Sequence, residues 1–514
     1  MKLTISSMKS FTKYILLLFI SGSMLISCAG KSDKKENSDE ISTENPNIIF
    51  ILVDDLGYGD IGCFGQQKIQ TPSIDRLAGE GIRFTESYAG NAVCAPCRST
   101  LMQGLHPGHA RVRSNGYNNY REALQEGDYT VAMMLQEAGY KTGLFGKWGL
   151  GLHNQYGIPN KMGFDEFFGY LNQRHAHNQY PEFLYHNEER VYFPENGTHH
   201  LRENYRGEQT YDENGICHPL GIEDPSKARY AFDVYCEKSL EFVRENKDNP
   251  FFLYLAYTPP HGAYVVPELG EYTNKDWSQS HKVYAAMITR VDTEIGKLMQ
   301  LLQELNIDEN TLVIFASDNG NTNGNAREGE ISTKAFFKNE SPRAGQKGDI
   351  LDGAFHVPAI ARWPKQIKPG QESDHIWAMW DFMPTAAEII QRQVPGNTDG
   401  ISILPTLIGE TDKQQQHEFL YWEYKEEQAV RMANWYGYKN KKGVLEIYDL
   451  EKNPEQDNDL SAEHHDIALK IEEIMKQEHT PSDVWPSPGE TDAEFKQRLA
   501  QLGIPERPNN VADF

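Results

Sequence analysis

A continuous apolar run, Asn47-Ile48-Ile49-Phe50-Ile51-Leu52-Val53, ends abruptly at Asp54-Asp55. A run of this kind, without polar alternation, is typical of a strand that is buried on both faces of a parallel sheet. Three later segments have the same form. Residues 142–146 end at Lys147, residues 251–257 lead to His261, and residues 311–316 lead to Asp318-Asn319. We therefore expect four buried strands that each end in polar side chains.

Helical patterns separate these strands. One begins at Thr71-Pro72 and is stopped by Gly81, a second covers residues 130–138, and the longest covers residues 281–305. The alternation predicts an α/β fold with a large, mostly parallel sheet sandwiched by helices. Ligands of such sheets gather beyond the carboxyl ends of the strands. The side chains expected at that edge are Asp54, Asp55, Lys147, His261, Asp318 and Asn319.

Four of these side chains form an oxygen-only set. Asp54, Asp55, Asp318 and Asn319 offer three carboxylates and an amide, which suit hard cations such as Ca²⁺ or Mg²⁺. Each pair alone could equally be a polar turn at the end of a strand. Their convergence at one edge is what predicts a metal site.

The segment Cys94-Ala95-Pro96-Cys97-Arg98 places a thiol just before a helix that Pro96 would begin. The positive end of a helix, with Arg98 one turn further on, suits a negatively charged reacting group. A Cys-x-x-Cys pair could instead be a redox pair or half of a zinc site. The sequence has no second Cys-x-x-Cys and no His-x-x-x-His, and the segment lies in a large chain, so both alternatives are less favoured.

Charge limits the classes of partner. The 514 residues carry a formal net charge of −24, which argues against nucleic-acid binding. The same charge opposes long-range attraction of an anionic substrate. Any bound anion must therefore be held by local positive groups.

Residues 1–27 have the form of a signal peptide. Lys9 and Lys13 precede an apolar run, residues 14–20, that is too short to span a bilayer. The following Leu25-Ile26-Ser27-Cys28 resembles a bacterial lipobox, which implies cleavage before Cys28 and lipid attachment to its thiol. Residues 28–46 are polar and are expected to form a solvated tether. We expect an exported bacterial lipoprotein at the periplasmic or outer-membrane surface, anchored to the membrane by lipid; an ordinary signal peptide with an incidental cysteine is the alternative.

Taken together, the motifs resemble those of the type I sulfatases of the alkaline phosphatase superfamily. The resemblance covers about residues 47–465, and its segments occur in the family's order: Asp54 to Asp60, Cys94 to Arg98, Gly146-Lys147-Trp148, Pro260-His261, Ser317 to Gly320, and Lys347 before Val357-Pro358. It implies an alkaline phosphatase-like fold and conversion of Cys94 to formylglycine by a maturation enzyme, with the hydrate as the nucleophile.

The resemblance also implies the remaining site residues. One Ca²⁺ would be bound by Asp54, Asp55, residue 94, Asp318 and Asn319. The sulfate would be held and polarised by Arg98, Lys147, His261 and Lys347. An imidazole suits protonation of the leaving alcohol, so His261 would be the acid, with Lys347 as the competing donor.

Three segments depart from the family pattern. Cys97 stands where serine is usual, and Gly149 stands where most members carry a histidine that touches the formylglycine hydroxyl. His153 could replace that histidine or could be a surface residue. The segment Asp352 to Pro358 differs from the usual Glu-Gly-Gly-x-Arg-Val-Pro, which leaves the shape of this loop open.

The expected domains are a catalytic domain over residues 47–396 and a small C-terminal domain with a tail over residues 397–514. Short antiparallel strands are predicted at 419–424, 429–432 and 444–448, with a helix at 465–478 and a helical patch at 493–502. Trp422 and Glu423 could reach the substrate, although a core tryptophan is the simpler interpretation.

Residues 169–180 are rich in amide, imidazole and aromatic side chains, which suit the hydroxyls and rings of sugars. His175 and His177 are therefore predicted substrate contacts; a polar surface loop is the alternative. The expected substrate is a sulfated carbohydrate, such as a glycosaminoglycan, mucin or algal glycan. Cys217 and Cys236 could pair in an exported protein, which their spacing leaves open.

Two other functions fit the sequence less well. A phosphatase or phosphodiesterase of the same superfamily usually holds two metals with histidine ligands, whereas Asn319 follows Asp318 here. A lipoprotein that binds sulfated glycans without turnover is the non-enzymatic alternative. The glycine at position 149, where most family members have a histidine, favours this alternative.

Overall fold

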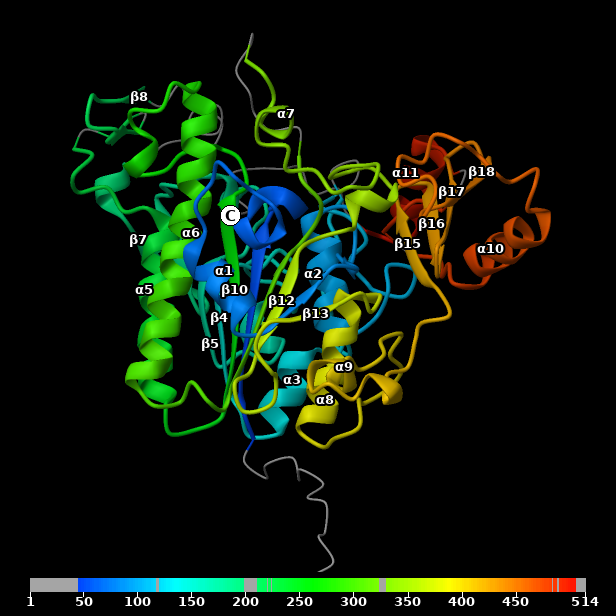
Figure 1. Ribbon diagram of the computed structural model, residues 1–514, viewed down its shortest axis with the longest axis horizontal. Coiled ribbons are helices and arrows are strands. Elements are labelled where there is room, and N and C mark those ends of the chain that lie inside the picture. Colours follow the sequence, from blue (N-terminus) through cyan, green and yellow to red (C-terminus); the bar gives the residue numbers. More distant parts are fainter. Residues whose placement is uncertain are drawn as a thin grey trace, which may run out of the picture. The chain divides into compact units, whose positions relative to one another are not determined.

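A ten-stranded sheet in the order β13-β2-β12-β11-β1-β10-β4-β5-β6-β7 forms the centre of the computed structural model (Figure 1). The structure describes residues 45–116, 120–197, 210–219, 221–222, 224–322, 330–482, 484–487 and 490–504. The strands of this sheet are β1 (Asn47–Asp54), β2 (Ile82–Phe84), β4 (Lys141–Lys147), β5 (Glu166–Tyr170), β6 (Phe183–His186), β7 (Glu189–Tyr192), β10 (Phe251–Pro260), β11 (Thr311–Ser317), β12 (Ala359–Arg362) and β13 (Gln371–Ser373).

The middle of the sheet is parallel. β11, β1, β10, β4 and β5 run in the same direction, whereas β12, β6 and β7 add antiparallel pairs toward the edges. The four strands predicted from the apolar runs are β1, β4, β10 and β11, and they are neighbours in the sheet. The predicted α/β fold with a mostly parallel sheet is confirmed.

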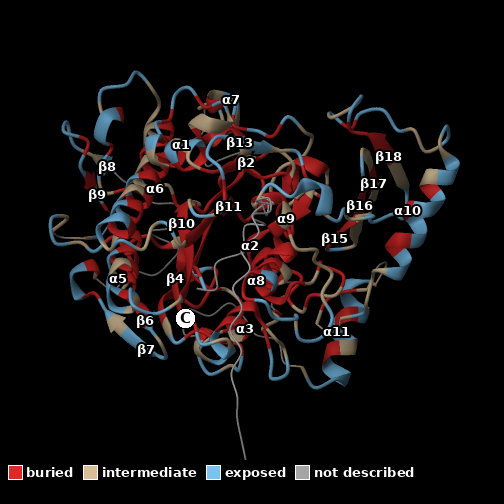
Figure 2. Ribbon diagram, turned by 60° about the horizontal axis from the view of Figure 1, so that its bottom comes forward, coloured by how far each residue is buried: buried red, intermediate tan, exposed pale blue. Residues whose placement is uncertain are grey.

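Helices cover both faces of the sheet because alternate residues of each strand point to opposite sides. Ile48, Phe50 and Leu52 of β1 belong to one core, which also contains residues of α2 (Cys94–Gln103), α3 (Val131–Glu137), α8 (Phe382–Ile389) and α9 (Leu404–Leu407). Ile49 and Ile51 belong to the opposite core, with α1 (Pro72–Gly79), α5 (Ala231–Asn246) and α6 (Gln279–Glu304). Figure 2 shows the central strands as buried and the outer sides of the helices as exposed.

Helices α1, α3 and α6 match the three helical patterns of the sequence to within two residues at each end. Helix α5 was not predicted from the sequence. Its buried side includes Phe232, Val234, Tyr235 and Phe242, so the amphipathic signal is present, but no side chain caps its first turn.

The C-terminal part contains a four-stranded antiparallel sheet, β15 (Leu420–Tyr424), β16 (Glu427–Met432), β17 (Trp435–Lys439) and β18 (Leu445–Asp449), with α10 (His465–Gln477) and α11 (Asp492–Gln501). Strand β17 is an addition to the predicted elements. Its Gly437 faces Ile471 of α10: a Cβ at residue 437 would lie 2.5 Å from Ile471 Cγ2. The small sheet therefore packs closely on the helix at a position where the strand pattern is interrupted by glycine.

Trp422 joins this small sheet to the part of the chain that forms the large sheet. It is fully buried, stacks on Phe355 with ring centroids 4.6 Å apart, and donates its indole N–H to Ala89 O at 3.0 Å. The carboxylate of Glu423 is buried against Arg113 at 2.6 Å. Trp422 is thus a core residue, and Glu423 is an internal ion-pair partner rather than a substrate contact.

Several expectations concern residues outside this description. The signal peptide, the lipobox with Cys28 and all but the last two residues of the tether lie among residues 1–44, which the structure does not describe. Among the described cysteines, Cys217 and Cys236 are both free. Within the described part of the chain, no helix combines the length and apolar character needed to cross a bilayer.

Candidate active site

The carboxyl ends of the central strands meet at one edge of the sheet. Val53 of β1 pairs with Tyr257 of β10 and with Ser317 of β11, so these three strands end at the same level. The residues that follow them are therefore forced together. The side chains brought to this edge are Asp54, Asp55, Lys147, His261, Asp318 and Asn319.

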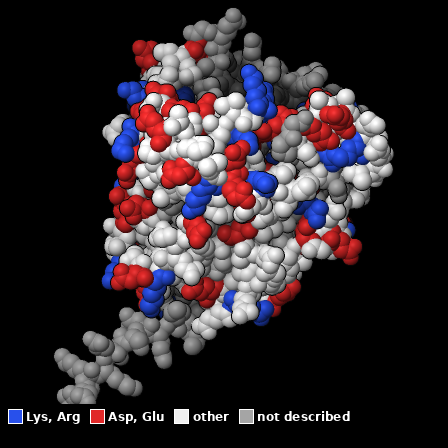
Figure 3. All heavy atoms as spheres, turned by 90° about the vertical axis from the view of Figure 1, so that its right-hand side faces the viewer, with Lys and Arg blue, Asp and Glu red and all other residues white. Residues whose placement is uncertain are grey.

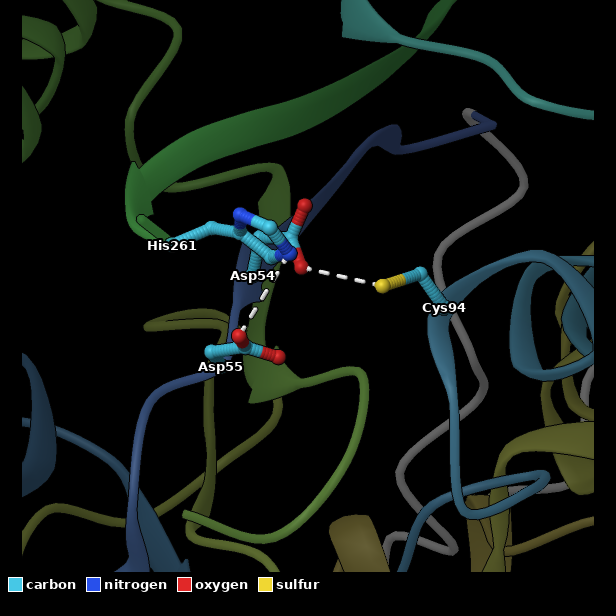
Figure 4. Close-up of side chains that lie close together, drawn as sticks. All are labelled: Asp54, Asp55, Cys94 and His261. Carbon is cyan, nitrogen blue, oxygen red and sulfur yellow. Dashed lines mark hydrogen bonds and ion pairs between the residues drawn. The ribbon is translucent and has the colours of Figure 1, made fainter. Parts of the chain in front are cut away.

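Helix α2 adds a thiol and a guanidinium. It begins at Cys94, with Val93 extended before it, so the prediction that Pro96 begins the helix is wrong by two residues. Pro96 is accommodated because the first N–H groups of a helix have no intrahelical partner. Cys94 Sγ lies 3.3 Å from Asp54 Oδ1, as Figure 4 shows.

Asp54 lies at the centre of the positive charges. Its Oδ2 is 2.5 Å from Lys147 Nζ and 3.5 Å from Arg98 Nη2, and all three side chains are buried. Burial alone would raise the pKa of Asp54. The charges of Lys147, His261 and Arg98 outweigh burial and hold this pKa well below its usual value, so the carboxyl group is ionised.

Asp318 occupies the other side of Arg98. Its Oδ2 accepts from Arg98 Nη2 at 2.9 Å, and its Oδ1 accepts from the Asp55 backbone N–H at 3.2 Å. Burial, with the neighbouring charge of Asp54, raises the pKa of Asp318 to about 7. Arg98 also donates to the Lys147 carbonyl at 2.5 Å. The guanidinium thus fixes the two carboxylates and the end of β4 relative to one another.

Asp55 faces a second set of partners. Lys347 Nζ lies 2.5 Å from Asp55 Oδ1 and 3.5 Å from Cys94 Sγ, and His261 Nε2 lies 3.6 Å from Asp55 Oδ2. Asn319 donates its amide N–H to Asp55 Oδ1 at 2.8 Å. Burial and the charge of Lys347 lower the pKa of His261.

The two thiols of α2 do not have the character of a redox pair. Burial, with the charge of Asp54, raises the pKa of Cys94 to about 12, and burial also raises the pKa of Cys97. Cys97 Sγ accepts a hydrogen bond from the Gly90 N–H at 3.2 Å on the core side of the helix. Reactive cysteines have lowered pKa values and partial exposure, and neither thiol has these properties.

The residues at this edge fit a hard cation. Asp54, Asp55, Cys94 and His261 each offer a ligand atom within 4.8 Å of the others. The Oδ1 atom of Asn319 is buried and has no hydrogen-bond partner among the described residues. Three carboxylates crowded around an unpaired amide oxygen are the donor set that Ca²⁺ or Mg²⁺ prefers.

Gln173 occupies the space beside Gly149. Gly149 N donates to Leu171 O at 3.1 Å, so the loops after β4 and β5 run together. A Cβ at residue 149 would lie 1.8 Å from Gln173 Nε2, and both polar atoms of the Gln173 amide are buried without partners among the described residues. Gln173 was not predicted as a site residue from the sequence. Two features could have indicated it: the amide-rich segment 169–180 and the absence of a side chain at residue 149. His153 is exposed and stacks on Tyr185, so it does not fill this space.

The two predicted substrate contacts lie in different surroundings. His177 stacks on His261, with ring centroids 4.3 Å apart, and is therefore beside the site. His175 packs between Tyr170 and Phe183, and burial lowers its pKa to about 3. The structure thus places His177 next to the reacting groups and His175 in an apolar environment.

The comparisons with known proteins agree with this geometry. The family model described as Sulfatase matches residues 46–391, and the model described as N-sulphoglucosamine sulphohydrolase, C-terminal, matches residues 346–480. The chain belongs to the sulfatase family. This family consists of sulfuric ester hydrolases, and its fold is the alkaline phosphatase-like fold predicted from the sequence.

Relatives of this sulfatase come from animals and bacteria. It is 30% identical to N-acetylgalactosamine-6-sulfatase of Canis lupus familiaris over 382 residues, which is 71% of this chain and 66% of the relative. It is 26% identical to N-acetylgalactosamine-6-O-sulfatase of Bacteroides thetaiotaomicron, covering 90% of this chain and 99% of the relative. The chain thus spans just under two thirds of the animal relative and nearly all of the bacterial one.

A solved structure supports the same assignment. Ps i-CgsB, crystallised in complex with k-i-k-neocarrahexaose, superposes with a TM-score of 0.71 at 26% identity, covering 90% of this chain and 98% of that one.

Proposed function

We propose that this protein hydrolyses sulfate esters of carbohydrates, with formylglycine formed from Cys94 as the nucleophile and one bound Ca²⁺. The observation that carries the proposal is the position of Cys94. Its Sγ lies 3.3 Å from Asp54 Oδ1 and 3.5 Å from Lys347 Nζ, between the acidic and the basic groups of the site. The Cys94 sulfur stands here for the hydroxyl oxygens of the formylglycine hydrate.

The charged side chains at this edge of the sheet balance one another without a cation. Three carboxylates (Asp54, Asp55 and Asp318) face three basic side chains (Arg98, Lys147 and Lys347). A divalent cation held by Asp54, Asp55, Asp318, Asn319 and residue 94 would make the site positive, as an incoming sulfate requires. When bound, the ion supplies a charge that lowers the pKa of the hydrate and neutralises the transferring group.

Each basic side chain has a distinct place. Arg98 is fully buried and bound to both Asp54 and Asp318, so we assign it to positioning these carboxylates. Lys147 and Lys347 lie on either side of the acidic cluster and are assigned to the sulfate oxygens. Fixed cations of this kind stabilise charge that develops during transfer without having to reorganise.

His261 is assigned as the acid that protonates the leaving alcohol. Its Nδ1 contacts the Gly262 carbonyl at 2.5 Å, which fixes the ring, and its Nε2 faces Asp55. A proton donor close to the nucleophile suits the release of a sugar hydroxyl, which is a poor leaving group without protonation.

A carbohydrate substrate is supported by the relatives and by the loop beside the site. The bacterial relative is named as an N-acetylgalactosamine-6-O-sulfatase, and the solved neighbour was crystallised with a hexaose. Here His177 stacks on His261, and Gln173 places an amide without a partner among the described residues beside Gly149, two residues after Lys147. Such groups suit sugar hydroxyls.

Local charge, rather than the charge of the whole protein, is expected to capture the substrate. The net charge of −24 repels anions at long range. On the face drawn in Figure 3, acidic and basic side chains are interspersed among uncharged ones. Binding should therefore depend on the buried cations at the sheet edge.

The decisive experiment combines chemistry at residue 94 with a substrate screen. Active protein should carry an aldehyde at residue 94 by peptide mass spectrometry, and it should release sulfate from sulfated monosaccharides or oligosaccharides. Cys94→Ala should bind but not turn over. An unmodified thiol in fully active protein, or hydrolysis of an aryl phosphate in preference to an aryl sulfate, would refute the proposal.

We also propose export as a lipoprotein, based on Lys9, Lys13 and the segment Leu25-Ile26-Ser27-Cys28. Cys28→Ala should move the protein from the detergent phase to the aqueous phase in cell fractionation. Equal partitioning of both forms would leave an ordinary signal peptide as the explanation.

A further inference from the structure

Two histidines and two carboxylates converge outside the active site, at a place that the proposed reaction does not use. His106 and His109 lie in the loop after α2, Asp399 precedes α9, and Glu478 follows α10. Three segments that are far apart in the sequence therefore meet here.

The donor atoms lie close together. His106 Nε2 is 3.0 Å from Glu478 Oε2 and 3.7 Å from Asp399 Oδ2, whereas His109 Nδ1 is 2.9 Å from Asp399 Oδ2. His109 Nε2 is 3.7 Å from Glu478 Oε2. His106, His109 and Asp399 each offer a ligand atom within 4.8 Å of the others. Ligands bonded to tetrahedral Zn²⁺ at about 2.1 Å are separated by about 3.4 Å, and the distances of His106 Nε2 and His109 Nδ1 to Asp399 Oδ2 lie on either side of this value.

We propose that this cluster is a second metal site, which binds one divalent transition-metal ion such as Zn²⁺ through His106, His109 and Asp399, with Glu478 as a neighbouring carboxylate. Imidazole and carboxylate are ligands of Zn²⁺, whereas the oxygen-rich active site favours Ca²⁺. Two carboxylates with two neutral imidazoles carry a charge of −2, which a divalent ion neutralises.

The backbone around the cluster is already fixed. His106 N donates to Asp399 Oδ2 at 2.9 Å, and Thr480 N donates to Gly108 O at 3.2 Å. One adjustment is needed: His106 Nδ1 accepts from the Gly108 N–H at 3.2 Å, and this contact must lengthen when Nε2 binds a metal and Nδ1 carries the proton. The ion would tie the loop that follows the Cys94 helix to the C-terminal segment.

The exposure of the four side chains permits entry of an ion. His106 is 5% exposed, but His109, Asp399 and Glu478 are 29%, 19% and 21% exposed. Solvent can therefore reach the site from the side of His109.

The test uses full-length protein, stripped of metal and then saturated with Ca²⁺ to occupy the active site, and titrated with ZnCl₂ alone. We expect one additional Zn²⁺ per chain by calorimetry and elemental analysis. With Co²⁺ as the probe, we expect visible absorption bands as intense as those of tetrahedral Co²⁺. With Zn²⁺, we expect the unfolding temperature of the protein to rise. His109→Gln and Asp399→Asn should each weaken binding by about tenfold or more. His186→Gln, at an exposed histidine away from the cluster, should leave binding unchanged.

Equal Zn²⁺ uptake by the native protein and both cluster variants, or no uptake beyond the Ca²⁺ site, would overturn the proposal and leave a metal-free histidine–carboxylate network. Circular dichroism of the variants checks that they are folded. None of these readouts depends on sulfate release, so the proposed sulfatase activity and the second metal site can fail separately.

Discussion

The imidazole of His177 stacks on that of His261, with ring centroids 4.3 Å apart and planes 20° apart. This contact joins the loop after β5 to the end of β10, and so it couples the expected sugar-binding segment to the expected acid. Burial and the charge of His261 keep the pKa of His177 well below its ordinary value, so His177 is neutral beside its partner.

His261→Ala is expected to lower kcat by about 10²- to 10⁴-fold for sugar sulfates, because the leaving alcohol loses its proton donor. The loss should be much smaller for an aryl sulfate with an acidic phenol, which leaves without protonation. Steady-state kinetics on both substrates check this. An equal loss on both would assign His261 to sulfate binding instead.

Lys147→Ala is expected to reduce kcat/KM by at least about 10²-fold, because it removes a buried cation 2.5 Å from Asp54. The matched control is Lys141→Ala, at the exposed first residue of the same strand, which should retain activity. Circular dichroism should show both variants folded. Normal turnover by the Lys147 variant would remove its assigned role.

Gly149→Ala is expected to destabilise the protein by about 1–3 kcal/mol, since residue 149 has φ of 85° and the new Cβ would meet the Gln173 amide. Gln173→Ala should remove the clash with the new Cβ but not the strain from the positive φ of residue 149. Urea unfolding of the single and double variants should therefore give a coupling energy of about 1 kcal/mol. Strict additivity would show that the two residues do not compete for the same space.

The stability of the protein should fall as the pH rises through neutrality because of Asp60. Burial raises the pKa of this carboxyl to about 7, despite hydrogen bonds from Tyr284, Asn339 and the Gly57 N–H. A folded-state pKa above the unfolded value gives stability that is fully present below about pH 4 and lost as the pH rises through about 7. The contribution is at most about 4 kcal/mol.

Urea unfolding from pH 5 to pH 8 tests this dependence. Asp60→Asn cannot ionise, so its free energy of unfolding should change less with pH than that of the native protein. Parallel curves for the two proteins would show that Asp60 is ionised throughout this range.

The strands and the site edge could be predicted because each apolar run stops close to a polar residue of the candidate site. In β1, the change from Val53 to Asp54 marks both the end of the strand and the start of the site. Parallel pairing then brings separate strand ends together, which explains why Asp54, Lys147 and His261 meet. The first residue of α2 was misplaced because a proline is tolerated at any of the first positions of a helix.

Gln173 could not be predicted in the same way. Its position follows from the contact between the loops after β4 and β5, and neither loop shows this contact in its own sequence. Strand β17 was missed for a similar reason: Gly437 is required by Ile471 of α10, a residue 34 positions away in the sequence. Contacts between residues that are far apart in the sequence leave no periodic pattern in the sequence itself.

Cys94 is 1% exposed, with its thiol enclosed by β1, α2 and the loop that carries Lys347. The maturation enzyme of the proposed function has to reach this side chain, and the folded chain leaves it almost no exposed surface. Under that proposal, the aldehyde would have to be installed before the sheet closes around residue 94. Synthesis, oxidation and folding would follow in a fixed order, and a chain that folds too early would remain permanently without its nucleophile.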